Sequence, residues 1–265
     1  IESQKIDINN DKKTFGLTER WITSQLSTTL NATQEGIKTY RFDLASQALY
    51  EFVWNEYCDW YLEFSKSTLN DKAKSEEEKR GTLYTLVYIL DALLRGLHPF
   101  MPFITEELWH RVAPILNKNS ETIMLESYPS KDEFERDKKA DEEIEWIKSF
   151  VMGIRRIRSE RDIPPGKELT VSTKGGSKKE LGWLNKNELL IKMLGKIEKI
   201  VPTEDEVSDA ALALAGEMTM LVPLADLINP QDEHNRISKI IDNLEKEKMQ
   251  LSTKLENKSF VERAP

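Results

Sequence analysis

Cysteine and histidine are scarce in this sequence. Cys58 is the single cysteine among 265 residues, so the chain cannot close a disulfide within itself or build a cysteine-rich zinc module. The three histidines, His98, His110 and His234, lie in separate segments, where a surface or capping role is more common than metal binding. We therefore expect no metal site.

Long hydrophobic runs are missing as well, since no apolar stretch approaches the roughly 20 residues of a membrane-spanning helix. The sequence also lacks the phosphate-binding loop GxxxxGK[ST], the serine nucleophile motif GxSxG and the zinc protease motif HExxH. Its 39% hydrophobic and 32% charged residues are typical of a folded, polar, helix-rich chain. We expect a cytoplasmic protein with no catalytic residues in this stretch and no membrane contact.

Basic charge is in deficit over the whole chain, whose net charge is −8. Such a value argues against a nucleic-acid partner, but it is only an average. Residues 145–170 carry six basic and four acidic side chains, and so form a basic island in an acidic chain. A local contact with nucleic acid remains possible there.

Aromatic residues, in contrast, are concentrated in residues 40–66. Six of them fall between Phe52 and Phe64. Polar residues recur at every fourth position of the same stretch, at Gln47, Glu51, Asn55, Asp59 and Glu63. A helix with one narrow polar stripe is buried on its other sides. A surface for stacking nucleobases would need exposed rings interleaved with basic residues, which are almost absent here. We predict a central bundle helix, starting near Asp43, whose aromatics are mostly core.

Three more helices are predicted in the first half of the chain. Residues 18–38 keep apolar side chains at helical spacing, with Thr18 as the N-cap. Residues 70–81 read as a polar connection, and residues 82–98 as a long helix that stops at Pro99, because proline cannot continue the hydrogen-bond ladder. A fourth helix then begins with Thr105 as its N-cap.

The second half of the chain predicts a change of architecture. After a polar region with a short extended-looking segment, TIMLESYP, we expect helices at 142–162 and 178–195 and strands at 169–172, 197–201, 211–216 and 218–224. Gly175 and Gly176 are expected to form a turn. The fold class is therefore mainly α, with three predicted parts: a helical bundle at 1–130, a small α+β domain entered by a long helix at 131–230, and a coiled-coil helix at 231–265.

The coiled-coil prediction rests on a heptad pattern near the end of the chain. Positions 237, 241, 244, 248, 251, 255 and 258 step alternately by four and three and hold Ile, Ile, Leu, Lys, Leu, Leu and Lys. A single amphipathic helix of this length needs a partner to be stable. We expect that partner to be a returning helix beyond residue 265.

Four segments carry a resemblance to a known family. FDLASQALYEFVWNEYCDWYLEFSK (42–66) and LHPFMPFITEELW (97–109) resemble the anticodon-binding helical bundle of class Ia aminoacyl-tRNA synthetases. IRRIRSERDIPPGKEL (154–169) and KLENKSFVERAP (254–265) are similar to the valine-specific members of that class. Isoleucine-specific members end in a cysteine-rich zinc module, which this chain cannot build. The resemblance extends over about residues 17–265.

The resemblance implies that this chain is the tRNA-binding portion of a longer enzyme. That parent would attach valine to its tRNA with ATP and magnesium, whereas this portion would hold no cofactor. The ATP-binding signatures of the family have no counterpart here, so we expect the catalytic domain, the editing domain and the first part of the bundle to precede residue 1. The implied partner is the tRNA for valine. The parent is expected to be monomeric, and a half-complete arm to self-associate.

The resemblance also suggests residues for anticodon binding, because unstacked bases are bound by aromatic stacking and by hydrogen bonds to their edges. The candidates are Arg41, Phe42, Phe103, Ile104 and Thr105. A structural alternative stays open for each place. Phe42 could pack on the first turn of its helix as a hydrophobic staple. Phe103 and Ile104 could be core and Thr105 only a cap, and for Phe103 we favour the core.

Basic residues elsewhere are candidates for the tRNA backbone, where arginine and lysine bind phosphate. They are Arg155, Arg156, Arg158, Lys246, Lys248 and Lys254. For the arginines, the favoured alternative is a solvated helix face with ion pairs four residues apart, such as Arg156 with Glu160. Two rival functions also remain: the corresponding region of an isoleucine or leucine enzyme, and a coiled-coil scaffold that does not bind RNA.

Overall fold

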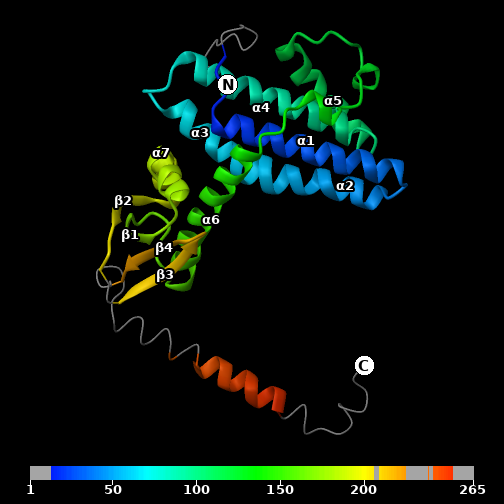
Figure 1. Cartoon of the computed structure of the whole chain (residues 1–265). Coiled ribbons are helices and arrows are strands. Elements are labelled where there is room, and N and C mark those ends of the chain that lie inside the picture. The colour runs from blue at the N-terminus through cyan, green and yellow to red at the C-terminus, as the bar shows by residue number, and fades with distance from the viewer. Residues whose placement is uncertain (1–12, 206–208, 225–237, 239–240, 253–265) are drawn as a thin grey trace. The chain divides into compact units, whose positions relative to one another are not determined.

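The computed structural model describes residues 13–205, 209–224, 238 and 241–252 (Figure 1). Contacts divide the chain into two compact units. The first unit consists of residues 1–151 and 177–195, and the second of residues 152–176 and 196–265. The long helix α6 (Lys138–Glu160) begins in the first unit and ends in the second. The three-part division predicted above stays a prediction.

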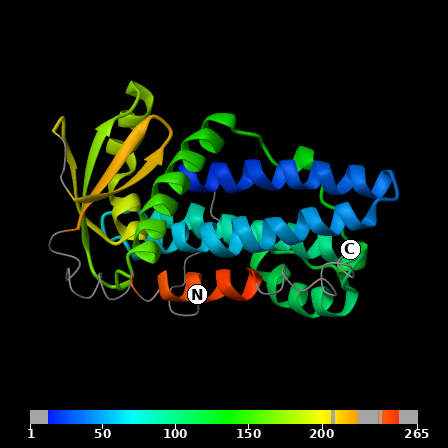
Figure 2. The same cartoon turned by 90° about the horizontal axis from the view of Figure 1, so that it is seen from below.

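The first unit is a helical bundle. Its helices are α1 (Leu17–Lys38), α2 (Phe42–Glu51), α3 (Leu62–Asn70), α4 (Glu76–Leu97), α5 (Pro102–Val112), the first part of α6, and α7 (Lys178–Gly195). The π-helical stretch η1 (Phe52–Tyr61) joins α2 to α3 without interruption. Figures 1 and 2 show α1 and α2 lying side by side as an antiparallel hairpin. The helices predicted in this part of the sequence are confirmed.

The helix starts differ from the prediction. Gly16, not Thr18, precedes α1, and the Glu19 carboxylate accepts the Gly16 N–H at 3.0 Å. α4 begins at Glu76, inside the predicted polar connection, because Ser75 and Glu78 cap each other's backbone N–H groups. α5 begins at Pro102, since proline is well suited to the first helical position.

The aromatic helix is largely core, as predicted. Phe52, Tyr57, Trp60, Tyr61 and Phe64 are buried, and Trp21 of α1 packs edge-on against Phe64 with ring centroids 5.5 Å apart. Trp54 is the exception among the six, with 52% of its surface exposed. The face that carries Trp54 is therefore not covered by the bundle.

A buried ionic network holds the region after α5 against the bundle. Asp91 of α4 is fully buried and accepts hydrogen bonds from Trp109 Nε1 (3.0 Å), Arg95 Nε (3.0 Å) and Lys118 Nζ (2.8 Å). Arg95 also donates to the Ser127 carbonyl at 2.8 Å. The region contains three short 3-10 turns, η2 (Ala113–Leu116), η3 (Ile123–Leu125) and η4 (Lys131–Glu133). The expected extended conformation of TIMLESYP is thus wrong at η3, where Ile123 turns into the core.

The second unit contains a four-stranded sheet. Its strands are β1 (Leu169–Gly175), β2 (Ile197–Pro202), β3 (Ala210–Ala215) and β4 (Met218–Pro223), in the order β2-β1-β4-β3. β1 and β2 are parallel and the other pairs are antiparallel. The end of α6 approaches the sheet closely at Gly153, where a Cβ atom would lie 3.1 Å from that of Ala213. The predicted strands are confirmed, and Gly175 and Gly176 adopt positive φ in the predicted turn.

The heptad segment is described only in part. Residues 241–252 are helical and exposed, including Ile241, Leu244 and Leu251 of the predicted seam. Positions 237, 255 and 258 lie outside the described residues, so pairing of this helix stays a prediction. In the described part of the chain, no helix is long and apolar enough to cross a membrane.

Candidate nucleic-acid interface

Two chain turns meet at one end of the bundle. One joins α1 to α2 and the other joins α4 to α5 (Figure 1). Residues of both turns line a common groove. Phe42 lines it from the α1–α2 turn and Phe100 from the α4–α5 turn. The candidate anticodon residues predicted from sequence, 41–42 and 103–105, therefore lie in or next to the two turns at this end, although some sixty residues separate them.

The α1–α2 turn leaves two aromatic rings exposed to solvent. Tyr40 has a positive φ of 59°, and the Arg41 N–H donates to the Gly36 carbonyl at 2.8 Å. Gly36 permits the tight turn, because a Cβ there would lie 3.0 Å from the Ala45 backbone nitrogen. Tyr40 is left 82% exposed and Phe42 53% exposed, with their ring centroids 6.3 Å apart. Phe42 thus keeps about half its surface available for contact.

Arg41 and Asp43 form an exposed ion pair beside these rings. Arg41 Nη2 lies 2.7 Å from Asp43 Oδ2, and Nε donates to Oδ1 at 2.9 Å. The hydrogen bond from Arg41 lowers the pKa of Asp43 to about 2, and the same bond raises the pKa of Arg41. Both groups are charged at neutral pH. Exposed pairs are weak, so a phosphate oxygen could replace the carboxylate as the guanidinium's partner.

The α4–α5 corner is held from within. The Thr105 side chain is buried, its hydroxyl lies 2.8 Å from His98 Nδ1, and the same oxygen lies 2.8 Å from the Met101 carbonyl. Thr105 is therefore not the N-cap of α5, because Met101 precedes the helix, and its buried side chain cannot reach a base. Contact of its backbone with a base stays a prediction. Phe103 is 89% exposed and Ile104 is also exposed. The interpretation of Phe103 and Ile104 as core is wrong.

Phe100 separates two apolar grooves at this end. The first, of about 690 Å³, is lined mainly by Ile37, Lys38, Phe42, Pro99, Phe100 and Tyr128, and we term it the Phe42 groove. The second, of about 550 Å³, is lined mainly by Gln47, Tyr50, Trp54, Leu97, Phe100 and Met101, and we term it the Trp54 groove. The contributions of Phe100, Tyr128 and Trp54 were not predicted from the sequence. The two prolines flanking Phe100 and Met101 were the available signal that these side chains sit on a turn.

Charge is distributed unevenly around the two grooves. Lys38 lines the Phe42 groove and Arg41 lies beside it. At the Trp54 groove, the lining residue Gln47 donates to the Glu51 carboxylate at 2.7 Å, which places a negative charge next to the lining. Lys38, and Arg41 once it exchanges Asp43 for a phosphate, would attract a polyanionic backbone to the Phe42 groove, whereas Glu51 would repel one from the Trp54 groove.

The predicted backbone contacts lie elsewhere in the chain. Arg155 and Arg156 are exposed on α6, and Arg156 Nε lies 3.8 Å from Glu160, which is the predicted pair. Arg158 is buried and donates to the carbonyls of Pro164 (3.2 Å) and Lys196 (2.9 Å), and desolvation lowers its pKa. Its guanidinium therefore supports the second unit.

The remaining lysine candidates belong to the C-terminal segment. Lys246 and Lys248 are exposed within the helical residues 241–252, whereas Lys254 lies outside the described residues. Their predicted contact with the tRNA backbone stays a prediction.

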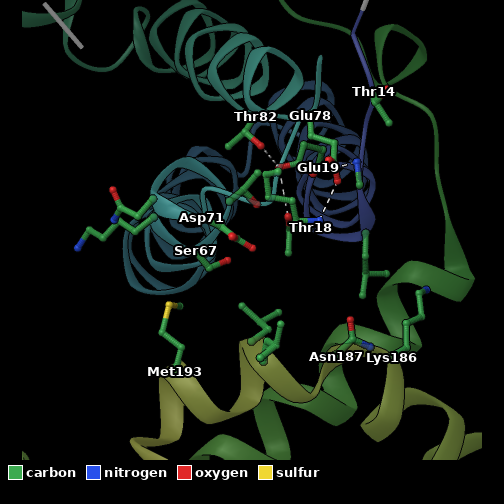
Figure 3. Close-up of a pocket in the computed structure, with 18 residues that line it drawn as sticks. Thr14, Thr18, Glu19, Ser67, Asp71, Glu78, Thr82, Lys186, Asn187 and Met193 are labelled. Atoms are coloured by element: carbon green, nitrogen blue, oxygen red, sulfur yellow. Dashed lines mark hydrogen bonds and ion pairs between the residues drawn. The ribbon is translucent and has the colours of Figure 1, made fainter. Parts of the chain in front are cut away.

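A third hollow, of about 550 Å³, lies at the beginning of α1, between α3 and α7 (Figure 3). Its buried carboxylate, Glu19, accepts hydrogen bonds from Thr82 Oγ1 (2.9 Å), Thr18 Oγ1 (3.2 Å) and the Gly16 N–H. Burial and the neighbouring Glu19 charge raise the pKa of Tyr61 well above its ordinary value, so its hydroxyl stays protonated.

These contacts indicate a structural role for the third hollow. Its lysines also pair with carboxylates: Lys66 with Glu63, Lys74 with Glu78 and Lys186 with Glu143. Over the part of the chain that the structure describes, no group of three or more His, Cys, Asp or Glu side chains could hold a metal ion.

Comparison with known proteins identifies the domain. A family model, the anticodon-binding domain of tRNA ligase, matches residues 19–173. The chain is also 38% identical over 266 aligned residues to the valine–tRNA ligase of Legionella pneumophila (strain Lens). That alignment covers 100% of this chain and 29% of the relative, so the chain spans less than a third of the relative's length. The chain belongs to the family of anticodon-binding domains of tRNA ligases.

Proposed function

We propose that this chain is the tRNA-binding portion of a valine–tRNA ligase and that the α1–α2 and α4–α5 turns bind the anticodon loop. The observation that carries the proposal is the exposure of Phe42 and Phe103 at one end of a bundle that belongs to an anticodon-binding family. The identity to a valine–tRNA ligase over the whole chain favours valine over isoleucine or leucine.

The surface suits an unstacked RNA strand. Phe42 and Tyr40 offer ring faces and edges for stacking, and Arg41 offers a guanidinium for phosphate. The backbone N–H groups of Phe103 and Ile104 lie in the first turn of α5, where no carbonyl of the helix accepts them. They can therefore donate to the edge of a base. The buried Thr105 side chain holds the corner, and any contact of Thr105 with RNA would come from its backbone.

The rest of the parent protein enters the proposal through the family. The parent would attach valine to its tRNA in the cytoplasm, with ATP and magnesium bound outside this chain. Arg155, Arg156, Lys246, Lys248 and Lys254 would contact the tRNA backbone. Arg158 no longer fits that role, because its guanidinium is buried against two carbonyls. The parent would be monomeric, whereas the helical segment at 241–252 would self-associate through Ile241 and Leu244.

The test is a titration of the 265-residue chain with a valine tRNA transcript and with a copy that carries a changed anticodon, at low and moderate salt. We expect a preference for the unchanged anticodon that survives added salt. Phe42→Ala and Phe103→Ala should each weaken binding about fivefold to a hundredfold, the range for losing one base–aromatic stack. Leu189→Ala, an exposed apolar residue of α7, is the matched control.

Two outcomes would contradict the proposal. Equal binding of both transcripts that disappears with salt would mean phosphate attraction without base contacts. No binding at low salt would favour the alternative of a scaffold that does not bind RNA. In either case Phe42 and Phe103 are not the residues that bind the anticodon.

A further inference from the structure

The Trp54 groove has no role in the function proposed so far. Tyr50 and Trp54 project from α2 and the start of η1, are 62% and 52% exposed, and their ring centroids lie 6.3 Å apart at an interplanar angle of 56°. Met101, also exposed, and Phe100 face them from the α4–α5 corner. Rings on one wall and a thioether with a phenyl ring on the other form a slot for a flat, apolar-faced group.

We propose that the Trp54 groove is a second nucleobase site, which binds another unstacked base of the same RNA loop whose neighbour stacks on Phe42. This inference rests on the proposed function. Its first support is continuity, because Phe100 forms a wall of both grooves and thus joins the Trp54 groove to the anticodon surface. A strand that places one base on Phe42 can therefore reach the Trp54 groove across Phe100.

Charge supports a base as the occupant of the Trp54 groove and favours one position for the sugar–phosphate backbone. Glu51, which accepts a hydrogen bond from the lining residue Gln47, disfavours a phosphate at the Trp54 groove. Lys38, and Arg41 once a phosphate replaces Asp43 as its partner, attract phosphates on the Phe42 side. A nucleobase carries no net charge and can enter the groove while its phosphates stay near the basic residues. The sugar–phosphate backbone would therefore run along the Phe42 side, with one base directed across Phe100.

The lining also indicates how selective the site is. Stacking against Trp54 and Tyr50 tolerates any base, because every base has a π face. Gln47 and Ser46 are the polar side chains of the lining, and the Gln47 amide can hydrogen-bond to a base edge. We expect a strong dependence on the presence of a base and a weaker dependence on its identity.

The test measures binding of the full chain to a fluorescently labelled RNA hairpin that contains the valine anticodon stem and loop. Trp54→Ala is expected to raise Kd about fivefold to a hundredfold. Trp54→Phe, which keeps a ring, should bind within about threefold of the wild type. Leu189→Ala on α7 serves as the control, and thermal unfolding checks that each variant is folded.

A second arm identifies the base that occupies each groove. The same hairpin is prepared with single abasic positions through the loop, and each is titrated against wild type, Phe42→Ala and Trp54→Ala. We expect one abasic position to lose its effect in Trp54→Ala and a different one to lose its effect in Phe42→Ala. Such non-additivity occurs when the deleted base and the deleted ring contact each other.

The outcomes separate the two proposals. If Phe42→Ala weakens binding while Trp54→Ala binds like the wild type, the second base site is wrong and the proposed function stands. If Trp54→Ala weakens binding but no abasic position couples to it, Trp54 supports the surface without holding a base, and the inference also fails. If neither variant changes binding and the anticodon has no effect, the proposed function itself is wrong.

Discussion

The helical unit contains two kinds of region that differ in which side chains they bury and which they expose to water. In the interior, the carboxylates of Glu19 and Asp91 are withdrawn from water and each accepts several hydrogen bonds. At the bundle end, the rings of Tyr40, Phe42 and Phe103 remain in water although they are apolar. A buried charge is tolerated only with its partners present. Exposed rings lower stability little but provide surface for a ligand.

Arg95 shows how a charged side chain is stabilised in the interior. Burial alone would lower the pKa of its guanidinium, but Asp91 and Glu133 raise that pKa above its ordinary value. The guanidinium therefore stays charged, and its hydrogen bond to the Ser127 carbonyl fastens that residue to α4. Tyr128, the next residue, donates its hydroxyl to the Gly96 carbonyl at 3.2 Å and lines the Phe42 groove. The buried ion pairs and hydrogen bonds thus hold Tyr128, which is part of the exposed surface, in place.

Removing a buried carboxylate should break the interior and gives the largest expected effect. Asp91→Ala leaves Arg95 and Lys118 without a buried counter-charge and Trp109 without its acceptor, so we expect the free energy of unfolding to fall by about 3–5 kcal/mol. Urea unfolding followed by helical circular dichroism measures it. Glu107→Ala, which breaks an exposed pair with Arg111, is the control and should change stability little. Equal losses of unfolding free energy in the two variants would contradict the contrast between buried and exposed carboxylates.

Two arginines of α6 extend the comparison to the second unit. Arg158→Ala removes donors to the carbonyls of Pro164 and Lys196 and should lower the free energy of unfolding by about 1–3 kcal/mol. Arg156→Ala removes only an exposed pair and should leave stability within about 0.5 kcal/mol. With tRNA, the ranking should reverse at a temperature where both variants are folded. Weaker tRNA binding by Arg158→Ala than by Arg156→Ala would show that burial is a poor guide to function here.

The sequence predicted the elements better than the surfaces. Apolar periodicity located α1 and the strands to within a few residues, because burial of one face imposes that spacing, whereas the start of α4 was missed by six residues. Cap assignment failed at Thr18 and Thr105, since Glu19 reaches back to Gly16 and Pro102 starts α5. Which residue begins a helix depends on competition between several neighbouring residues that could each cap it.

The candidate site was predictable only in part. Phe42 could be proposed from its place before a helix, but the exposure of Phe103 could not, because an apolar residue does not indicate which side of its helix is covered. Trp54 was assigned with the core for the same reason. Phe100 and Tyr128 reach the site from segments distant in sequence, and only the folded bundle brings them to Phe42.

Acid should weaken the start of α6 through Asp137, the smallest effect that we expect. Its carboxylate accepts the Ala140 N–H at 3.0 Å and pairs with Arg20, and these contacts, the Ala140 hydrogen bond first, lower its pKa. A carboxyl group with a lowered folded-state pKa stabilises the protein fully above its unfolded pKa of about 3.9. This contribution is lost as the pH falls through the folded value.

Asp137→Asn keeps a side-chain acceptor at the start of α6 but removes the charge. It should therefore cost less than about 1 kcal/mol at pH 7, and the difference from the wild type should shrink as the pH falls below about 4. Urea unfolding at a series of pH values measures both quantities. A difference that stays constant down to the lowest pH would mean that the charge of Asp137 contributes nothing. The start of α6 would then depend on hydrogen-bond geometry alone. The contrast between fully hydrogen-bonded buried charges and exposed rings would then not extend to the partly exposed edge of the bundle.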